Sequence, residues 1–462
     1  MHMINRIKNN FKQCQRRLKE GWFFRGYNYS VSERERFYRR PSDWVIHLFV
    51  NGELSTNQRM AARCLAAERS GGKREWAEFM VACLSAIAEG DMDIDEGTRQ
   101  ITEKAAKEDG SVCHHGFWLE LRRTLIALGF LRAGGIMRDR ALNTLFAQLE
   151  LSGRKYAPQP LAIFQAALEC GDFDTAGSYV KDAGDSPGEK KGSLLSPLPT
   201  LFGQFKNRPD REIRQALRLW DRPFQRLRQL VQDKSVAIVG PSVTESELSS
   251  EIDSHEVVVR CGFMGPSSLP PGAGEKTSVS FYAGHKVREL VSRGQSKALN
   301  ALELVLLKHS SDRERLREIG VDDKFIGVSL PARQAFFDTH PMAIPQVVHN
   351  LVFARPRGVK VFKVNFFLEP GYPAGYEIGR EIRKDQGWKN NNYKVQDPAA
   401  KCESFANVHD PLAQFRFMKH AWRCGLIKGD KEFTDIINLS GEEYLRRLEN
   451  IYGYNGTLRL SL

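Results

Sequence analysis

The tripeptide Gly240-Pro241-Ser242 and the imidazole of His409 are the residues of this sequence whose types could do chemistry. The tripeptide ends the apolar run SVAIV. A glycine lets the backbone approach a ligand closely, and a serine hydroxyl with the following backbone N–H groups can hold phosphate oxygens. An imidazole titrates near neutrality, which suits it to take a proton from a hydroxyl group. From the residues alone, structural roles explain these positions at least as well as chemical ones do. The tripeptide could be a simple strand-to-loop turn, and His409 could cap a helix.

Short runs rich in Val, Ile and Phe follow residue 235, and helical patterns separate several of them. They are SVAIVG, EVVVRCGF, SVSFYAG, LELVLLK, KFIGVSL and VKVFKVNFF. Buried strands that alternate with helices predict an α/β domain with a mainly parallel sheet. Such sheets bind ligands at the carboxyl ends of their strands, and Gly240 is expected at one of these ends.

The first half of the chain has a helical pattern, with apolar residues at three- and four-residue spacing. Its segment ALECGDFDTAGSYV is typical of the turn between paired helices of a tetratricopeptide-type repeat. A stretch rich in Gly, Ser and Pro then indicates a linker. We predict a basic amphipathic segment at 1–40, an α-helical domain of such hairpins at 41–185, a linker at 186–200 and the α/β domain at 201–462.

Charge and cysteine usage limit the classes of partner. The 462 residues carry a formal charge of +12, which suits nucleic acid, anionic lipid or phosphorylated substrates. We expect no nucleic-acid partner, because zinc-finger spacing and RNA-binding aromatic signatures are missing from the sequence. The eight cysteines form no CxxC pair, so we expect no metal site and a reducing compartment.

The sequence predicts a cytoplasmic protein, since no apolar run reaches the length of a membrane span and the N-terminus lacks the apolar core of a signal peptide. That N-terminus nevertheless has apolar residues at helical spacing, with Lys and Arg between them. These residues are Ile4, Ile7, Phe11, Cys14 and Leu18. Such a helix either makes peripheral contact with the inner membrane or packs its apolar stripe on the next helices.

Three motifs, AIVGPS, IDSHEVVVR and GAGEKTSVSFY, occur in the order of the large sialyl motif and resemble it. In the animal-type sialyltransferase family that motif has a strand ending in Gly-Asn-Ser, an Ile-Asp-x-His block, an Arg-x-Asn and a Gly-x-Lys/Arg-Thr. The matching positions are Gly240, Ser242, Asp253, His255, Arg260, Gly274, Lys276 and Thr277. Pro241 and Gly262 stand where the family has Asn.

Two later segments extend this resemblance. The segment DTHPMAIPQVVHNLVFARPRGVKVFKVNFF resembles the small sialyl motif, and its His340-Pro341 pair is similar to that of bacterial transferases of Kdo. The family's Ser-x-Gly falls there near Ala343. The segment FANVHDPLAQFRFMKHAWRCGLIK resembles the very small motif, with His409 at the family's His. Ala413 and Gln414 occupy the family's Glu positions.

The resemblance implies a Rossmann-like, GT-A-like sialyltransferase fold in a bacterial glycosyltransferase. The expected reaction transfers sialic acid or a related keto-acid sugar from a CMP-sugar donor to a surface glycan or lipid-linked glycan, without metal or further cofactor. His409 is the expected general base. The expected nucleotide site consists of Gly240, Pro241, Ser242, Gly262, His340 and Ala343.

Alternatives stay open for the remaining motif residues and for the whole chain. A structural role is the simpler interpretation of Asp253, His255 and Arg260, although Arg260 could also pair with the acidic donor. The chain could be a retaining CMP-Kdo transferase. It could also be a non-catalytic helical-repeat interaction protein with a degenerate transferase domain, which the missing Glu after His409 favours.

Overall fold

The computed structural model of the protein describes residues 74–108, 115–152, 160–184, 222–242, 247–292, 299–330, 332–369 and 398–453. The predicted segments 1–40 and 186–200 lie outside these residues. Contacts group the chain into two compact units. The first is Met1–Tyr156, Trp388–Asn407 and Leu445–Leu462, and the second is Ala157–Gly387 and Val408–Tyr444. The predicted domain boundaries at 185 and 201 do not coincide with this grouping and stay a prediction.

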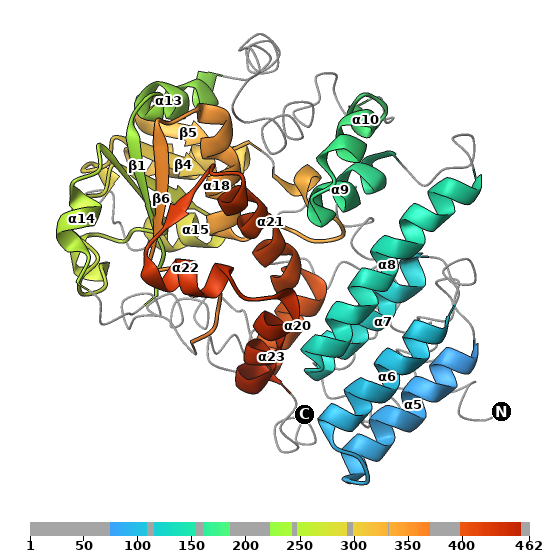
Figure 1. Ribbon diagram of the computed structural model, residues 1–462. Coiled ribbons are helices and arrows are strands. Elements are labelled where there is room, and N and C mark those ends of the chain that lie inside the picture. Colours follow the sequence, from blue (N-terminus) through green and yellow to red (C-terminus); the bar gives the residue numbers. More distant parts are fainter. Residues whose placement is uncertain are drawn as a thin grey trace. The chain divides into compact units, whose positions relative to one another are not determined.

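The described residues of the first unit form helices (Figure 1). They are α5 (Arg74–Glu89), α6 (Ile94–Lys107), α7 (His115–Leu128), α8 (Leu131–Ser152), α20 (Pro398–Asn407) and most of α23 (Gly441–Tyr452). Helix α7 is buried from Phe117 to its end and packs on α8 and α20. Gly129 separates α7 from α8 because its φ of 91° lies in the left-handed region, which ends a helix.

The second unit is built on a parallel sheet of seven strands in the order β5-β4-β3-β2-β1-β6-β7. The strands are β1 (Ser235–Val239), β2 (Val257–Cys261), β3 (Val279–Tyr282), β4 (Leu304–Leu307), β5 (Ile326–Val328), β6 (Gly358–Phe362) and β7 (Lys428–Gly429). All neighbouring strands run parallel. Strands β2, β3 and β4 are buried at every position, as expected for a sheet covered on both faces. The predicted Rossmann-like α/β class with a parallel sheet is confirmed.

The described residues of the second unit also form helices. They are α9 (Pro160–Cys170), α10 (Phe173–Gly184), α13 (Arg222–Val231), α14 (Ser249–Asp253), α15 (Gly284–Ser292), α17 (Arg313–Glu318), α18 (Ala343–Ala354), α21 (Pro411–Arg423) and α22 (Lys431–Ile437). Short 3₁₀ turns are η2 (Pro266–Ser268), η3 (Ser310–Asp312), η4 (Asp323–Phe325) and η5 (Arg333–Ala335). Helix α13 packs on α18, β4 and β5, whereas α15 packs on β3 and α17.

The strand order reverses between β1 and β6. From β1 the chain proceeds outward to β5, and it then returns through α18 to β6 on the other side of β1. Strands β1 and β6 lie side by side (Figure 1), and Ile238 and Val361 are register partners in them. In open α/β sheets the crevice beyond the carboxyl ends of such a strand pair is where ligands bind. The residues that follow β1 and β6 therefore define the candidate site.

Candidate active site

The turn Gly240-Pro241-Ser242 follows β1 and is bonded to the chain that leaves β6. The Gly240 N–H donates to the Phe362 carbonyl (2.8 Å), and the Ser242 N–H donates to the Lys363 carbonyl (3.2 Å). A Cβ on Gly240 would lie 2.3 Å from the same Lys363 oxygen, so only glycine fits there. The buried Ser242 hydroxyl accepts a hydrogen bond from the Asn365 N–H (3.1 Å). The two strand ends thus form one connected structure at the reversal point.

The backbone after β6 is strained. Lys363, Phe366 and Phe367 have φ values of 52°, 51° and 68°, in the left-handed region that residues other than glycine rarely adopt. Such conformations persist where the surroundings enforce them, and they cluster at functional sites. The Asp430 carboxylate, which also caps α22, holds the first of them by accepting from the Lys363 N–H (2.7 Å). The predicted strand VKVFKVNFF therefore ends at Phe362.

A mixed cluster of charges lies at the ends of β6 and β7. The Lys363 ammonium donates to the Pro271 carbonyl (3.2 Å), and burial lowers its pKa although Glu247, Glu432 and Asp430 oppose that effect. Burial raises the pKa of Glu432 to about 7, with further contributions from the carboxylates of Glu369 and Asp430. Within the described part of the chain, the Glu432 Oε2 atom has no hydrogen-bond partner. Both groups are thus ionisable side chains with shifted pKa values, a feature typical of functional sites.

We expect Glu432→Gln to change the pH dependence of stability. A carboxyl group whose pKa is raised by folding stabilises the fold below its unfolded-state pKa, and this contribution is lost as the pH rises through about 7. Between about pH 5 and about pH 8 the wild-type protein should lose about 1–2 kcal/mol more unfolding free energy than the variant, after a discount for solvent screening. Urea unfolding at both pH values measures this difference. Equal pH dependence of the two proteins would contradict it.

His340 and His409 are distant in the sequence and adjacent in the structure. The His409 Nδ1 atom lies 2.9 Å from the His340 carbonyl oxygen. Because a carbonyl oxygen only accepts, the neutral ring carries its proton on Nδ1, and Nε2 keeps its lone pair. The His340 N–H in turn donates to the Val408 carbonyl (2.9 Å), so the two chain segments are bonded in both directions. This tautomer is the one that a general base acting through Nε2 requires.

Both histidines lie at the carboxyl edge of the sheet. Helix α18 leads from the end of β5 to the start of β6, and α21, which follows α20 in the chain, leads to the start of β7. Because each helix returns the chain to the start of a parallel strand, its N-terminus lies at the carboxyl edge. Ala343 is the first residue of α18, and Asp410 caps α21 directly after His409. His340, Ala343 and His409 therefore share an edge with Gly240.

The loop after β6 links the two groups of predicted site residues. Its Asn365 bonds Ser242, and the neighbouring Phe366 ring lies 5.9 Å from the Phe415 ring of α21, between ring centroids. Gly262 is one strand removed from the β1–β6 pair. It follows β2, with a φ of 68° and its N–H bonded to the Phe281 carbonyl (2.8 Å). The structure thus groups Gly240, Pro241 and Ser242 with the strand reversal, and His340 and Ala343 with His409.

The remaining residues of the large motif fix one turn. The Asp253 carboxylate accepts the N–H groups of Glu275 (2.9 Å) and Lys276 (3.0 Å). The Arg260 guanidinium donates to the carbonyls of Ala273, Gly274 and Lys276 and to the Thr277 hydroxyl. A Cβ on Gly274, whose φ is 70°, would lie 2.4 Å from the Asp253 carboxylate. These contacts hold α14, β2 and the chain entering β3 together.

His255 makes similar local contacts. Its Nδ1 lies 2.9 Å from the Glu251 carbonyl oxygen, and its ring packs edge-on against Phe362. Its own carbonyl accepts a hydrogen bond from the Lys276 ammonium (2.5 Å). These partners all belong to α14, β6 and the fixed turn.

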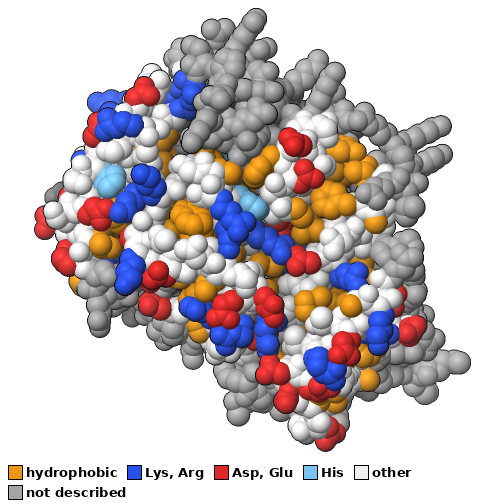
Figure 2. Space-filling model, viewed as in Figure 1, with side chains coloured by type: hydrophobic (Ala, Val, Ile, Leu, Met, Phe, Trp, Pro, Cys, Tyr) orange, Lys and Arg blue, Asp and Glu red, His pale blue; other side chains and the backbone are white. Residues whose placement is uncertain are grey.

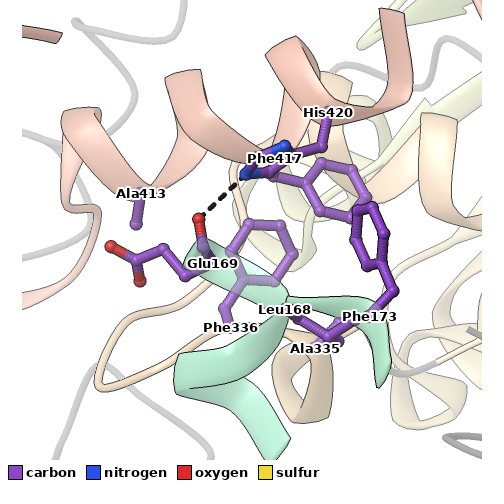
Figure 3. A pocket seen from close by; sticks show the side chains of 8 residues that line it. All are labelled: Leu168, Glu169, Phe173, Ala335, Phe336, Ala413, Phe417 and His420. Carbon is purple, nitrogen blue, oxygen red and sulfur yellow. Dashed lines mark hydrogen bonds between the residues drawn. The ribbon is translucent and has the colours of Figure 1, made fainter. Parts of the chain in front are cut away.

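A pocket lies elsewhere in the same unit, between α9, η5 and α21 (Figure 3). It is lined by Leu168, Glu169, Phe173, Ala335, Phe336, Ala413, Phe417 and His420. The His420 Nε2 atom lies 2.9 Å from the Glu169 carbonyl oxygen, and the Glu169 carboxylate pairs with Arg416 (3.1 Å). The polar groups of the pocket therefore serve to join α9 to α21, and none of its lining residues belongs to the predicted site.

The face drawn in Figure 2 carries Lys and Arg side chains interspersed with Asp and Glu over its described part. Within the described ranges, no group of His, Cys, Asp or Glu side chains is arranged to hold a metal ion. No helix among those described is long and apolar enough to cross a membrane. No family model matches the chain, and no curated protein is recognisably similar to it in sequence.

Proposed function

We propose that the chain is a glycosyltransferase that transfers sialic acid or a related keto-acid sugar from a CMP-sugar donor to a glycan acceptor. The observation that carries this proposal is the bond between His409 Nδ1 and the His340 carbonyl (2.9 Å). With the proton on Nδ1, Nε2 is the ring atom that can take a proton from an acceptor hydroxyl. The ring lies at the edge where α/β sheets bind their ligands.

The proposed reaction is a direct displacement at the anomeric carbon of the donor. The acceptor hydroxyl forms the new C–O bond while His409 Nε2 takes its proton. The bond between the anomeric carbon and the CMP phosphate oxygen breaks, and its electron pair leaves with CMP. A leaving group this good requires the protein mainly to orient the reactants and to remove one proton.

The chain at the carboxyl ends of β1 and β6 supports the nucleotide half of the proposal. Gly240 brings the backbone to the reversal point without a side chain, and Ser242 places a hydroxyl beside it. A hydroxyl oxygen that accepts from Asn365 can still donate its own proton to a phosphate oxygen. Ser242 is therefore the residue that we expect to contact the leaving phosphate.

Calorimetry with CMP tests the donor site. We expect CMP to bind and uridine monophosphate to bind more weakly. Ser242→Ala should weaken CMP binding about tenfold, since a hydrogen bond to a charged group contributes roughly 1.5–3 kcal/mol. Ser250→Ala, which removes an exposed hydroxyl on α14, is the matched control and should leave binding unchanged. Equal binding of both nucleotides, or of neither, would count against a CMP-sugar enzyme.

The sugar itself requires a donor screen. Incubation of the protein with CMP-sialic acid and with CMP-Kdo, read by mass spectrometry of the products, distinguishes the two. Transfer from CMP-sialic acid but not from CMP-Kdo supports the sialyltransferase proposal. Transfer from the second with retained configuration supports the Kdo alternative.

A non-catalytic role is the second candidate. It is favoured by Ala413 and Gln414, which stand at the positions where the sialyltransferase family has Glu. Ala413 lines the pocket between α9 and α21, and Gln414 is committed to hydrogen bonds with the chain around His340. CMP binding without transfer from any CMP-sugar would select this alternative.

A further inference from the structure

The side chain of Gln414 bonds to the same carbonyl that orients His409. Gln414 lies in the first turns of α21 and is 3% exposed. Its Nε2 donates to the His340 carbonyl (3.1 Å), and its Oε1 accepts from the Met342 N–H (3.0 Å). The carboxamide therefore spans the short segment that precedes α18. It fixes the position of the oxygen that His409 Nδ1 contacts.

A carboxamide satisfies both partners, and an ionised carboxylate does not. An amide side chain donates through nitrogen and accepts through oxygen, whereas an ionised carboxylate only accepts. A glutamate at 414 would accept from Met342 but would set a carboxylate oxygen against the His340 carbonyl oxygen. In a buried site, two acceptor oxygens that face each other without a proton between them lower the free energy of unfolding. The sialyltransferase family that the chain resembles has Glu at this position. The Gln found here instead matches the hydrogen-bonding groups around it.

Neighbouring hydrogen bonds hold the chain segment that carries His409. The Thr339 hydroxyl accepts from the Asp410 N–H (2.8 Å) and donates to the Val408 carbonyl (3.1 Å). The Asp410 carboxylate caps α21 through the N–H groups of the first turn. The backbone on both sides of His409 is therefore fixed, and the ring orientation depends on the position of the His340 carbonyl.

We propose that Gln414 is a positioning residue that holds the His340 carbonyl against His409 and so fixes the base tautomer. The inference rests on the proposed role of His409 as general base. Gln414 does not touch the reacting atoms; it acts through His340. Its contribution is a ring that carries its proton on Nδ1 before any substrate binds.

Nitrogen-15 NMR of the imidazole groups in the 462-residue chain tests this directly. The signals of His409 among the 11 histidines are identified by their loss in His409→Asn. At about pH 8, above the ordinary pKa of histidine, we expect a single tautomer with a protonated Nδ1 and an unprotonated Nε2. A wild-type ring that carries its proton on Nε2 would overturn the proposal without any further variant.

Variants of Gln414 give the second readout. In Gln414→Glu we expect loss of the single tautomer and a mixture of both, because the His340 carbonyl is displaced. Gln414→Met, which removes the amide without adding charge, should show the same loss. Gln346→Met is the matched control: Gln346 is 2% exposed and donates instead to the Ser329 hydroxyl (2.9 Å). A single Nδ1–H tautomer retained in both Gln414 variants would refute the positioning role.

The activity readout separates this inference from the proposed function. If the wild-type protein transfers a sugar, Gln414→Met should lower kcat about tenfold with little change in KM, as loss of one orienting hydrogen bond predicts. If it transfers no sugar from any CMP-sugar, the proposed function fails. The NMR result still decides whether Gln414 fixes the ring.

Discussion

His409→Asn is expected to lower the transfer rate by a factor of about 10²–10⁴ while leaving CMP binding intact, because general-base catalysis contributes about that much. Asparagine keeps an N–H donor near the position of Nδ1, so the bond to the His340 carbonyl can persist. It removes Nε2, the atom proposed to take the proton from the acceptor hydroxyl. The variant therefore separates the base from the local fold. Steady-state kinetics with saturating donor, together with CMP calorimetry, measure the two effects.

A matched control exists at His255. Its Nδ1 also lies 2.9 Å from a backbone carbonyl oxygen, that of Glu251. Its other contacts are structural, so His255→Asn should leave turnover unchanged. Unchanged turnover in His409→Asn would remove it as the base. Equal losses in both variants would mean that the effect comes from general destabilisation.

The core of the sheet could be predicted from the sequence because its strands are buried on both faces. The first five apolar runs contain the strands β1 to β5, and the sixth, VKVFKVNFF, contains all of β6 except Gly358. The seventh strand was missed, since β7 has two residues, Lys428 and Gly429, and neither is apolar. A strand this short exists only because the edge of β6 pairs with it. Such pairing leaves no periodic pattern in the sequence.

The ends of the elements were harder to predict than their cores. The run VKVFKVNFF has the composition of one strand, but β6 stops where Lys363 enters the left-handed region. This conformation depends on the Asp430 carboxylate, which lies 67 residues away in the sequence. Likewise, the helical pattern around residue 129 is continuous, yet Gly129 breaks it into α7 and α8. Contacts distant in sequence or a single backbone angle decide these boundaries.

The candidate site could be predicted in part. The Gly-Pro-Ser turn after an apolar run indicated the end of β1, and the order of the motifs drew attention to His409. The bond between His409 and His340 joins two loops that no spacing rule connects. Glu432 carries no sequence signal, because its raised pKa arises from burial and from carboxylates brought together by folding. In the sequence Gln414 is only a departure from the pattern of the sialyltransferase family, and its role follows from its two hydrogen bonds in the structure.

Arg260→Met is expected to lower the stability of the sheet unit by about 3–5 kcal/mol, the range for breaking a buried charged hydrogen-bond network. The guanidinium is 4% exposed, and burial lowers its pKa to about 10. It nevertheless remains charged near neutrality, and backbone carbonyls of the turn before β3 accept its hydrogen bonds. Methionine fills a similar volume but leaves these oxygens buried without donors. Hydrogen exchange of the amides in β2 and β3 measures the loss in the unit concerned.

Arg313→Met is the matched control for this experiment. Arg313 pairs with Asp323 (2.9 Å) in a partly exposed position, and loss of such a pair costs less than about 1 kcal/mol. The comparison also decides between the two interpretations of Arg260. A large loss of protection in β2 and β3 identifies a structural residue. If protection is unchanged and binding of the CMP-sugar is lost while CMP still binds, Arg260 instead contacts the acidic group of the donor sugar.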